Sequence, residues 1–320
     1  MNKVKLSILI GFSFSLLCIV GFSSVYPKIN DLWVENQFWN GLSSFYSIEL
    51  PVRIDSLTEL EITVNPSGST LFIIGPYQGF TMVDAESILN YLGRGGTLVL
   101  LDDFGSGNQL LSLLGLDVRF DSRVMIDPIF RDRNMVLPRA ITIAYPTVEY
   151  IVLNYPTTLT NVDTEYVTVW SSPVSYLLSE MDEEPNGYSS NPVVAEIPFD
   201  NGKIVLISDS SIFINGMIEK GDNLELLEYL SKGSSMIDES HILETRLSLF
   251  QSVLANIYRV TGVYEIRYVM TLSVILLIFR LNLGVQEQRL DPVEEVMSLH
   301  PEYDRKTVEW LDREREKIHE

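Results

Sequence analysis

The chain has 320 residues, of which 46% are hydrophobic, and it carries a formal net charge of −20 at pH 7. That length allows two small domains, or one larger domain together with membrane segments. An acidic balance of this size argues against a nucleic-acid-binding role, which needs a basic surface. The single cysteine, Cys18, excludes a disulfide framework and a thiolate metal site.

The first feature in chain order is an uncharged apolar run at residues 6–25, which follows Lys3 and Lys5. A run of about 20 apolar residues is long enough to cross a bilayer as a helix, and the basic side of such a helix stays in the cytoplasm. We therefore predict a transmembrane signal anchor at residues 1–28. A cleavable signal peptide is the alternative, although the run is longer than a typical signal-peptide core.

The segment after this anchor carries three aromatic residues, Trp33, Phe38 and Trp39. Aromatic side chains gather at membrane interfaces, so we expect an interface belt together with some packing on the domain that follows. Residues 46–54 fit a strand, and residues 56–60 fit a short helix.

The pattern at residues 69–108 predicts a strand, a helix and a second strand. The apolar run at residues 71–74 is closed by Gly75-Pro76, and proline cannot donate to a strand ladder. A second apolar run follows at residues 97–101. Because the two strands are joined through a helix, a right-handed crossover and a parallel sheet are expected.

The helix between these strands is expected to begin after Thr81, a good capping residue. It should place its apolar residues on one side, namely Val83, Ile88, Leu89 and Leu92. Glycine takes the left-handed conformation that a helix exit needs, so the helix should stop at Gly93, Gly95 and Gly96.

Further along, the apolar spacing predicts a helix at residues 110–115, an extended stretch at residues 119–130 and strands at residues 150–153 and 166–170. An acidic turn follows at residues 180–187. Clustered carboxylates can bind calcium, but this spacing lacks the alternation of an EF-hand loop, so we interpret it as a surface turn.

Two apolar runs at residues 192–198 and 203–208 flank Asn201-Gly202, which is a strong hairpin signal. A helix at residues 224–230 comes next. These elements complete an α/β domain predicted for residues 29–235.

The remaining chain has three predicted parts. Residues 236–262 form an amphipathic helix beside the membrane, and residues 263–285 form a second transmembrane helix. Its uncharged core is short, so a buried core helix is the alternative, although Arg280 could extend to the membrane interface. Residues 286–320 form a charged cytoplasmic tail, which leaves the central domain outside the cytoplasm.

The negative charge is concentrated in the predicted domain. Residues 29–264 hold 31 acidic and 12 basic side chains. Such a surface repels anionic lipid and favours cations or basic partners, and solubility on a crowded surface is the simpler explanation of the charge.

Polar residues gather where two predicted parallel strands end. Asp102, Asp103 and Asp209 follow the apolar runs directly, and ligands of parallel sheets bind outside the carboxyl ends of the strands. The same edge could also hold Asn108, Ser210, Ser211 and Asn215. We expect either a polar pocket for a small ligand or a divalent ion held by the three aspartates, or side chains that only cap turns and helix starts.

The loop at residues 105–108 could cradle a phosphate through its backbone N–H groups. It lacks the lysine of a Walker loop and the full spacing of a dinucleotide fingerprint, so this signal is weak.

The chain resembles a family of unknown function, largely archaeal and bacterial, whose members carry a membrane-anchored domain of the class I glutamine-amidotransferase-like fold. The resemblance covers roughly residues 29–232 and rests on motifs that occur in order. They are Leu71 to Pro76, Gly95 to Val99, Asp102 to Asn108, Ser171 to Tyr176, and Gly202 to Asp209 with Phe213, Asn215 and Asn223.

This resemblance implies a flavodoxin-like, doubly wound parallel sheet, here held between two transmembrane helices. Relatives include the auxiliary component of gliding-type ABC transporters, and family members often accompany MoxR-type ATPases. By analogy, the partners expected are those of a membrane-protein complex.

True amidotransferases use a nucleophilic cysteine with a histidine base. This sequence has no cysteine after Cys18 and no histidine before His241, so glutaminase chemistry is absent and the domain is expected to be a pseudoenzyme. We predict a non-catalytic binding or assembly module without a cofactor, a divalent cation remaining open. The alternative is an extracytoplasmic hydrolase that uses the carboxylate-rich edge, with Asp209 beside Ser210 as its candidate pair.

Overall fold

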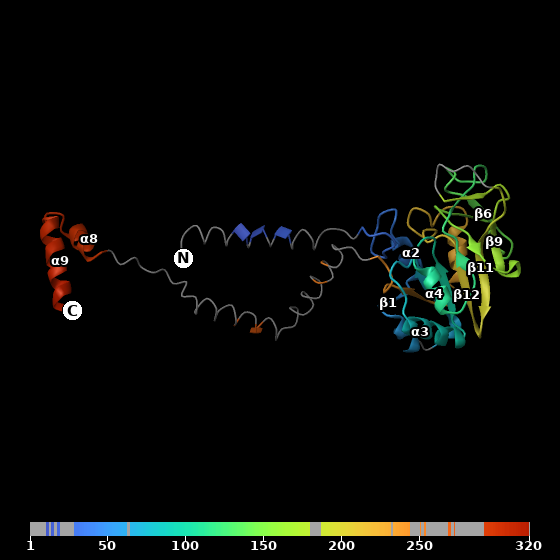
Figure 1. The fold of residues 1–320 in the computed structure, drawn as a ribbon, viewed down its shortest axis with the longest axis horizontal. Coiled ribbons are helices and arrows are strands. Elements are labelled where there is room, and N and C mark those ends of the chain that lie inside the picture. The colour runs from blue at the N-terminus through green and yellow to red at the C-terminus, as the bar shows by residue number, and fades with distance from the viewer. Residues whose placement is uncertain are drawn as a thin grey trace. The chain divides into compact units, whose positions relative to one another are not determined.

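The computed structural model describes residues 29–62, 65–179, 187–231, 233–243 and 291–319, together with isolated residues at 11, 12, 14, 15, 18, 19, 250, 253, 268, 269 and 272. The chain divides into two units, Met1–Leu254 and Ala255–Glu320, and each is described by itself (Figure 1).

The first unit is built on a nine-stranded sheet with the strand order β1-β13-β2-β3-β12-β11-β9-β6-β7. In that order the strands are β1 (Val52–Ile54), β13 (Ser234–Asp238), β2 (Ser69–Ile74), β3 (Thr97–Leu101), β12 (Gly202–Ile207), β11 (Pro192–Phe199), β9 (Val167–Ser171), β6 (Arg139–Thr142) and β7 (Tyr150–Val152).

Five neighbouring strands, from β1 to β12, pair in parallel. The last four extend the sheet through antiparallel pairs. In this part of the sheet the strand direction alternates, so β11 and β6 run opposite to the first five strands, whereas β9 and β7 run in the same direction. Most strands of the sheet therefore point the same way. This confirms the predicted α/β class and the parallel central unit.

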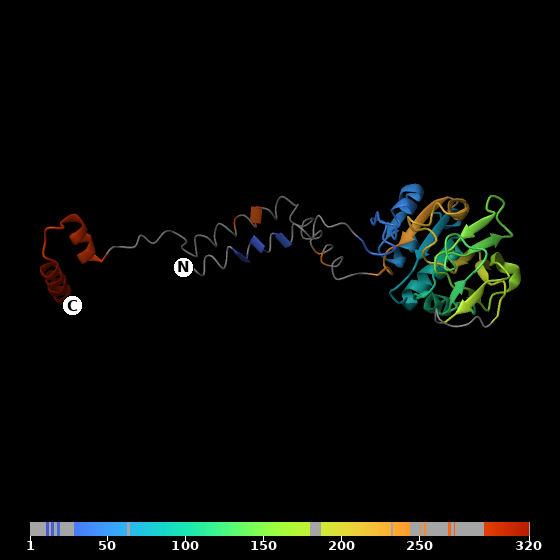
Figure 2. The same cartoon turned by 90° about the horizontal axis from the view of Figure 1, so that it is seen from above.

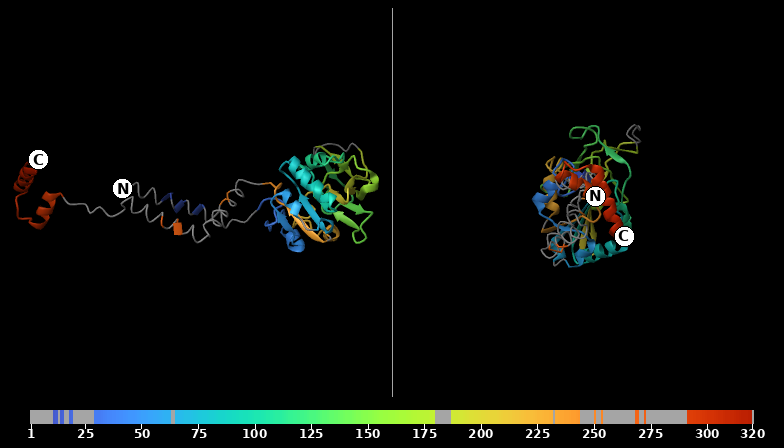
Figure 3. Two further views of the ribbon diagram at one scale, coloured as in Figure 1. Left: turned by 90° about the horizontal axis from the view of Figure 1, so that it is seen from below. Right: turned by 90° about the vertical axis from the view of Figure 1, so that its left-hand side faces the viewer.

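The parallel strands are buried on both faces, as their uninterrupted apolar runs require. Along β2, Leu71 and Ile73 pack against the side of α3 (Met82–Gly93) and α4 (Gly107–Leu113). The alternate residues, Phe72 and Ile74, pack against α2 (Ser43–Glu49) and α5 (Asn223–Leu230). Helices therefore cover both faces of the sheet (Figures 2 and 3).

The predicted start and stop of α3 are confirmed. Thr81 and Asp84 form a capping box, in which each side chain accepts a hydrogen bond from the other residue's backbone N–H. Gly95 leaves the helix in the left-handed region with a φ of +90°. One expected core position is wrong, because Val83 is 56% exposed.

The strand expected at residues 46–54 is divided between the end of a helix and a short strand. Helix α2 occupies Ser43–Glu49, and only Val52–Ile54 form a strand. Leu50 separates the two in the left-handed conformation, with a φ of +46°. The short helix expected next is the 3-10 helix η1 (Leu57–Ile62).

The expected domain boundary at residue 235 is also wrong. Residues Ser234–Asp238 form β13, which inserts between β1 and β2. The amphipathic helix predicted to start at residue 236 therefore does not begin there, because pairing with β1 on one side and β2 on the other satisfies the backbone of this segment instead.

The hairpin of β11 and β12 is confirmed, with Phe199 paired to Gly202. Its two loop residues are Asp200 and Asn201, and Asp200 has a φ of +52°. Two short ladders complete the unit, pairing β10 (Tyr176–Leu178) with β5 (Val124–Ile126) and β4 (Arg119–Phe120) with β8 (Leu159–Thr160). The remaining 3-10 turns are η2 (Pro66–Gly68) and η3 (Thr164–Tyr166).

Residues 291–319 of the second unit form a pair of helices, α8 (Pro292–Leu299) and α9 (Arg305–His319). Asp291 caps α8 through the N–H of Val293. Arg305 joins the helices through an ion pair with Glu294, with N and O 2.6 Å apart.

Within the described residues, no helix has the length and apolar character that a membrane crossing needs. The spans predicted at residues 1–28 and 263–285 fall almost entirely outside the described residues. So do residues 244–262 of the predicted amphipathic helix, apart from Phe250 and Val253, and residues 180–186 of the acidic turn. These predictions stay predictions.

Candidate functional site

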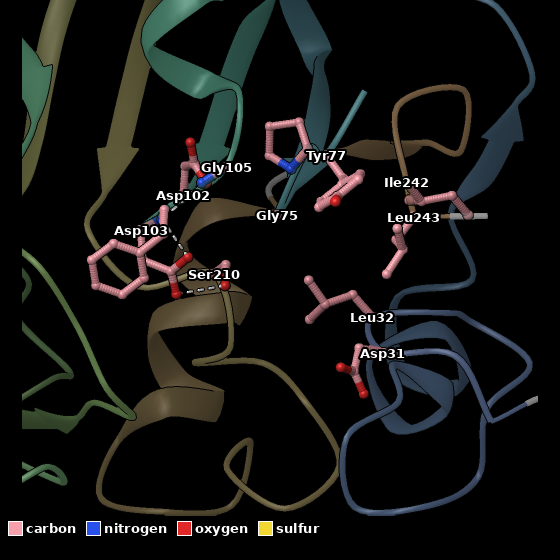
Figure 4. A pocket seen from close by; sticks show the side chains of 12 residues that line it. Asp31, Leu32, Gly75, Tyr77, Asp102, Asp103, Gly105, Ser210, Ile242 and Leu243 are labelled. Atoms are coloured by element: carbon pink, nitrogen blue, oxygen red, sulfur yellow. Dashed lines mark hydrogen bonds between the residues drawn. The ribbon is translucent and has the colours of Figure 1, made fainter. Parts of the chain in front are cut away.

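The candidate site lies where the parallel strands end. Register pairs Leu101 of β3 with Ile207 of β12, and the N–H of Asp102 extends the ladder to the carbonyl of Ile207 at 3.1 Å. The loops that follow these strands open a pocket of about 210 Å³ (Figure 4). It is lined by Asp31, Leu32, Gly75, Pro76, Tyr77, Asp102, Asp103, Phe104, Gly105, Ser210, Ile242 and Leu243.

Asp102 is buried and organises the loop that leads into α4. One carboxylate oxygen accepts the N–H groups of Asp103 and Gly105, each at 2.9 Å, and the other accepts the N–H of Gly107 at 2.7 Å. Burial raises the pKa of Asp102 to about 6, and the charge of Asp103 contributes in the same direction. Both oxygens therefore serve the loop.

Asp209 is fully buried beneath the end of β12 and does not line the pocket. One oxygen accepts the N–H of Asn154 at 2.6 Å, and the other accepts both the N–H and the hydroxyl of Ser211 at 2.8 Å. Burial raises the pKa of Asp209 to about 7, with the charge of Asp103 again adding to the shift. Through its bond with Asn154, Asp209 connects the segment after β7 to the end of β12.

Asp103 is the half-buried carboxylate of the pocket. It accepts the N–H of Phe104 at 2.6 Å and the hydroxyl of Ser210 at 2.8 Å. The hydroxyl of Ser210 thus faces Asp103, whereas the candidate catalytic pair required it to face Asp209. That predicted pair is not formed.

Two other predicted site residues lie elsewhere. The side chain of Asn108 donates to and accepts from the backbone of Phe120, both at 2.9 Å, which fixes β4 beside α4. Asn215 donates to the carbonyls of Asn36 and Phe38 and accepts the N–H of Ser44. Both asparagines hold backbone segments in place and neither lines the pocket.

The divalent-ion hypothesis finds no geometry in its favour. Across the described ranges, no group of three or more histidine, cysteine, aspartate or glutamate side chains could hold a metal ion. Backbone N–H donors face Asp102 and Asp209 from both sides, whereas a cation needs oxygens directed toward a shared centre.

His241 belongs to the domain, although the sequence placed it in a distant segment. Its carbonyl accepts the N–H groups of Tyr77 and Gln78 at 2.7 and 3.0 Å. Its ring is buried, stacks on Phe80 with centroids 4.0 Å apart, and contacts Asp238 through Nδ1 at 2.8 Å. The ring does not line the pocket, so it cannot act as a base for Ser210.

Four pocket residues had no signal in the sequence pattern. Asp31 and Leu32 come from the segment before α2, and Ile242 and Leu243 come from the segment after β13 (Figure 4). Ile242 and Leu243 reach the strand ends because the neighbouring His241 attaches its segment to the loop after β2. Asp31 and Leu32 precede a loop that Asn215 holds against the domain. Short irregular segments of this kind have no periodicity that would predict their place.

Two solved structures show a distant likeness to the chain. A structure titled "mmIFT52 N-terminal domain" is 18% identical, with a TM-score of 0.41, over 55% of this chain and 80% of its own. The crystal structure of a β-galactosidase from Bacillus circulans sp. alkalophilus is 14% identical, with a TM-score of 0.30, over 51% of this chain and 23% of its own.

No curated protein shows significant similarity to the chain. One family model does match, over residues 35–230, which is more than half of the chain. This range contains most of the sheet together with Asp102, Asp103 and Asp209. The chain therefore belongs to the family described as "Domain of unknown function (DUF4350)".

Proposed function

We propose that the chain is a non-catalytic, membrane-anchored binding module of a membrane complex, and that the pocket beside Asp103 receives a positively charged group of a partner. The observation that carries this proposal is uncompensated charge at the strand ends. Asp103, the half-buried carboxylate of the pocket, forms no ion pair with any cation in the part of the chain that the structure describes, and neither do the buried Asp102 and Asp209. A lysine or arginine side chain would complement that charge.

The shape of the pocket supports the same kind of ligand. Asp103 and Ser210 supply polar atoms, while Leu32, Tyr77 and Phe104 supply apolar walls (Figure 4). Long basic side chains combine an apolar stem with a charged end, so they match both surfaces. Hydrogen bonds fix Asp103 before a ligand arrives, which lowers the entropic cost of binding.

The hydrogen bonds that Asp102 and Asp209 already accept support the proposal that the module is non-catalytic. Asp102 and Asp209 already accept backbone N–H groups on both oxygens. A general base must have an oxygen within reach of the substrate proton, and these carboxylates have none. The ring of His241 contacts Asp238 and Phe80 instead of the pocket.

The membrane part of the proposal rests on the sequence. The apolar runs at residues 6–25 and 268–279 flank the domain and lead us to propose two spans with the domain outside the cytoplasm. By resemblance, we further propose a class I glutamine-amidotransferase-like, flavodoxin-like fold and a partner in an ABC-transporter or MoxR-type ATPase system. Five adjacent parallel strands with helices on both faces support that fold.

One observation favours a hydrolase as the second candidate. The Ser210 hydroxyl lies 2.8 Å from a carboxylate oxygen of Asp103, and both line the pocket. In that case Ser210 would be the nucleophile and Asp103 its base. Ser210→Ala separates the two candidates, because it should abolish hydrolysis of ester or amide reporters but keeps the Asp103 carboxylate that would bind a cationic group.

The test is a thermal-shift titration of the full chain in detergent with a lysine-rich peptide. We expect stabilisation that follows mass action and disappears when the peptide lysines are acetylated. Asp103→Asn should remove the effect, whereas Asp117→Asn, which neutralises an exposed carboxylate outside the pocket, should retain it. Equal shifts in the two variants would reject the pocket as the binding site.

A further inference from the structure

The loop at residues 36–41, here called the aromatic loop, is held rigidly from within. The buried side chain of Asn36 donates to the carbonyl of Asn30 at 2.8 Å and to the side chain of Asn40 at 3.0 Å. It also accepts the N–H of Phe38 at 2.9 Å. Gly41 is required in this loop, because a Cβ there would overlap the carbonyl of Asn36.

The domain also holds this loop from outside. Asn215 donates its side-chain amide to the carbonyls of Asn36 and Phe38, at 3.0 and 2.6 Å. The N–H of Gly216 binds the carbonyl of Trp39 at 2.8 Å. The backbone of the aromatic loop is thus fixed by contacts from both ends of its own segment and from the β12–α5 connection.

This fixed loop exposes its two largest side chains. Phe38 is 50% exposed and Trp39 is 70% exposed. Trp33, the third aromatic of the segment, is half-buried and donates its ring N–H to the carbonyl of Leu243 at 3.2 Å. A loop that is held this firmly while presenting two aromatic rings to solvent is typical of an interaction surface.

Chain length limits how far the aromatic loop can lie from the predicted first span. Only residues 26–28 separate the described segment from the apolar run that ends at residue 25. Four peptide steps reach at most about 14 Å, so residue 29 lies within that distance of the apolar run. Because Asn36 binds Asn30 directly, the aromatic loop stays beside the same point of the chain.

We propose that Phe38 and Trp39 insert into the headgroup region of the bilayer that holds residues 6–25. This inference rests on the membrane anchoring proposed above. Tryptophan and other aromatic side chains favour this region, where the apolar ring is buried and polar atoms stay hydrated. The acidic domain favours a zwitterionic lipid surface over an anionic one. Inserted there, the loop fixes the orientation of the domain on the membrane.

The test uses the full chain in phosphatidylcholine nanodiscs, with brominated acyl chains as quenchers of tryptophan fluorescence. We compare the parent chain with Trp39→Phe, which removes the reporter but keeps an aromatic ring, and with Trp170→Phe, a matched control on β9. Bromination should quench the parent, the quenched component should shrink in Trp39→Phe, and it should remain unchanged in Trp170→Phe. Thermal melts confirm that both variants are folded.

Flotation with phosphatidylcholine vesicles separates the two proposals. If the chain floats and Trp39→Phe is quenched to the same extent as the parent, lipid insertion of the aromatic loop is rejected while the anchoring stands. If the chain does not float, the anchoring is rejected and the insertion with it.

Discussion

At the scale of single residues, the strand-end aspartates act as multiple acceptors. A helix cap uses one side-chain oxygen, so asparagine replaces aspartate at a simple cap with little loss. Asp102 uses both oxygens for three N–H donors. The capping interpretation of the sequence was therefore right in kind, but Asp102 accepts more donors than a simple helix cap does.

Asp102→Asn should lower the free energy of unfolding by about 1–3 kcal/mol, because the new amide group would face an N–H donor in a buried site. Asp103→Asn is the matched control. Its oxygens accept one donor each, and an amide can donate to the hydroxyl of Ser210 in return. Chemical denaturation of the full chain in detergent measures both. Equal losses in the two variants would contradict the multiple-acceptor role.

At the scale of elements, the turn from α3 into β3 depends on two glycines for different reasons. Gly95 takes the left-handed conformation, with a φ of +90°. Gly96 does not, but a Cβ there would overlap the ring of Tyr91. That ring is buried, and its hydroxyl donates to the carbonyl of Ser69 at 2.7 Å, so it cannot move aside.

Gly96→Ala should therefore cost about 1–3 kcal/mol of stability through overpacking. Gly68→Ala provides the control, since a Cβ there meets no atom within 4 Å and its φ is not left-handed. Thermal melts of both variants measure this cost. A Gly96→Ala chain with the melting temperature of the parent would show that the ring of Tyr91 can move to make room for the new Cβ.

The elements that the sequence predicted well are those with strong local signals. The unit from β2 to β3 has uninterrupted apolar runs, a capping box and a glycine exit, and the β11–β12 hairpin has Asn201-Gly202. In contrast, β13 is a five-residue strand whose place is set by pairing with β1 and β2. Such long-range pairing leaves no periodicity in the segment itself, so the boundary at residue 235 could not be predicted correctly.

The candidate site, like the fold, was predictable only where local sequence signals determine the position of a residue. Asp102 and Asp103 could be placed because each follows a run of buried strand residues and neighbouring parallel strands share an edge. The positions of Asp209 and Asn215 outside the pocket could not be predicted, because they depend on which segments fold over this edge of the sheet. Asp209 is bound by Asn154, and Asn215 is bound by residues 36–44, through hydrogen bonds between segments far apart in sequence.

At the scale of the whole molecule, the buried carboxylates predict an unusual dependence of stability on pH. Asp102 and Asp209 have pKa values of about 6 and about 7 in the folded chain, both above the ordinary value of 3.8. The folded state thus binds these protons more tightly than the unfolded state does. Their stabilising contribution is complete below about pH 4 and is lost as the pH rises through 6 to 7.

Other groups modify this trend without reversing it. Burial also raises the pKa of Glu49 and of Glu239, which adds to the effect with the same sign. The hydrogen bond from Arg123 lowers the pKa of Asp121, so that carboxylate stabilises the fold above its unfolded pKa and loses this contribution as the pH falls. Its window lies below that of Asp102 and Asp209.

We therefore expect the melting temperature of the full chain in detergent to fall between pH 5 and pH 8. Asp103→Asn should weaken this fall and move it to lower pH, because the charge of Asp103 helps to raise the pKa of both Asp102 and Asp209. Asp117→Asn, which removes an exposed carboxylate with the same charge, should keep the parent profile. Melts at fixed ionic strength separate the local effect from general screening. A melting temperature that rises from pH 5 to pH 8, or an Asp103→Asn profile identical to that of the parent, would show that the strand-end carboxylates do not govern the stability of the domain.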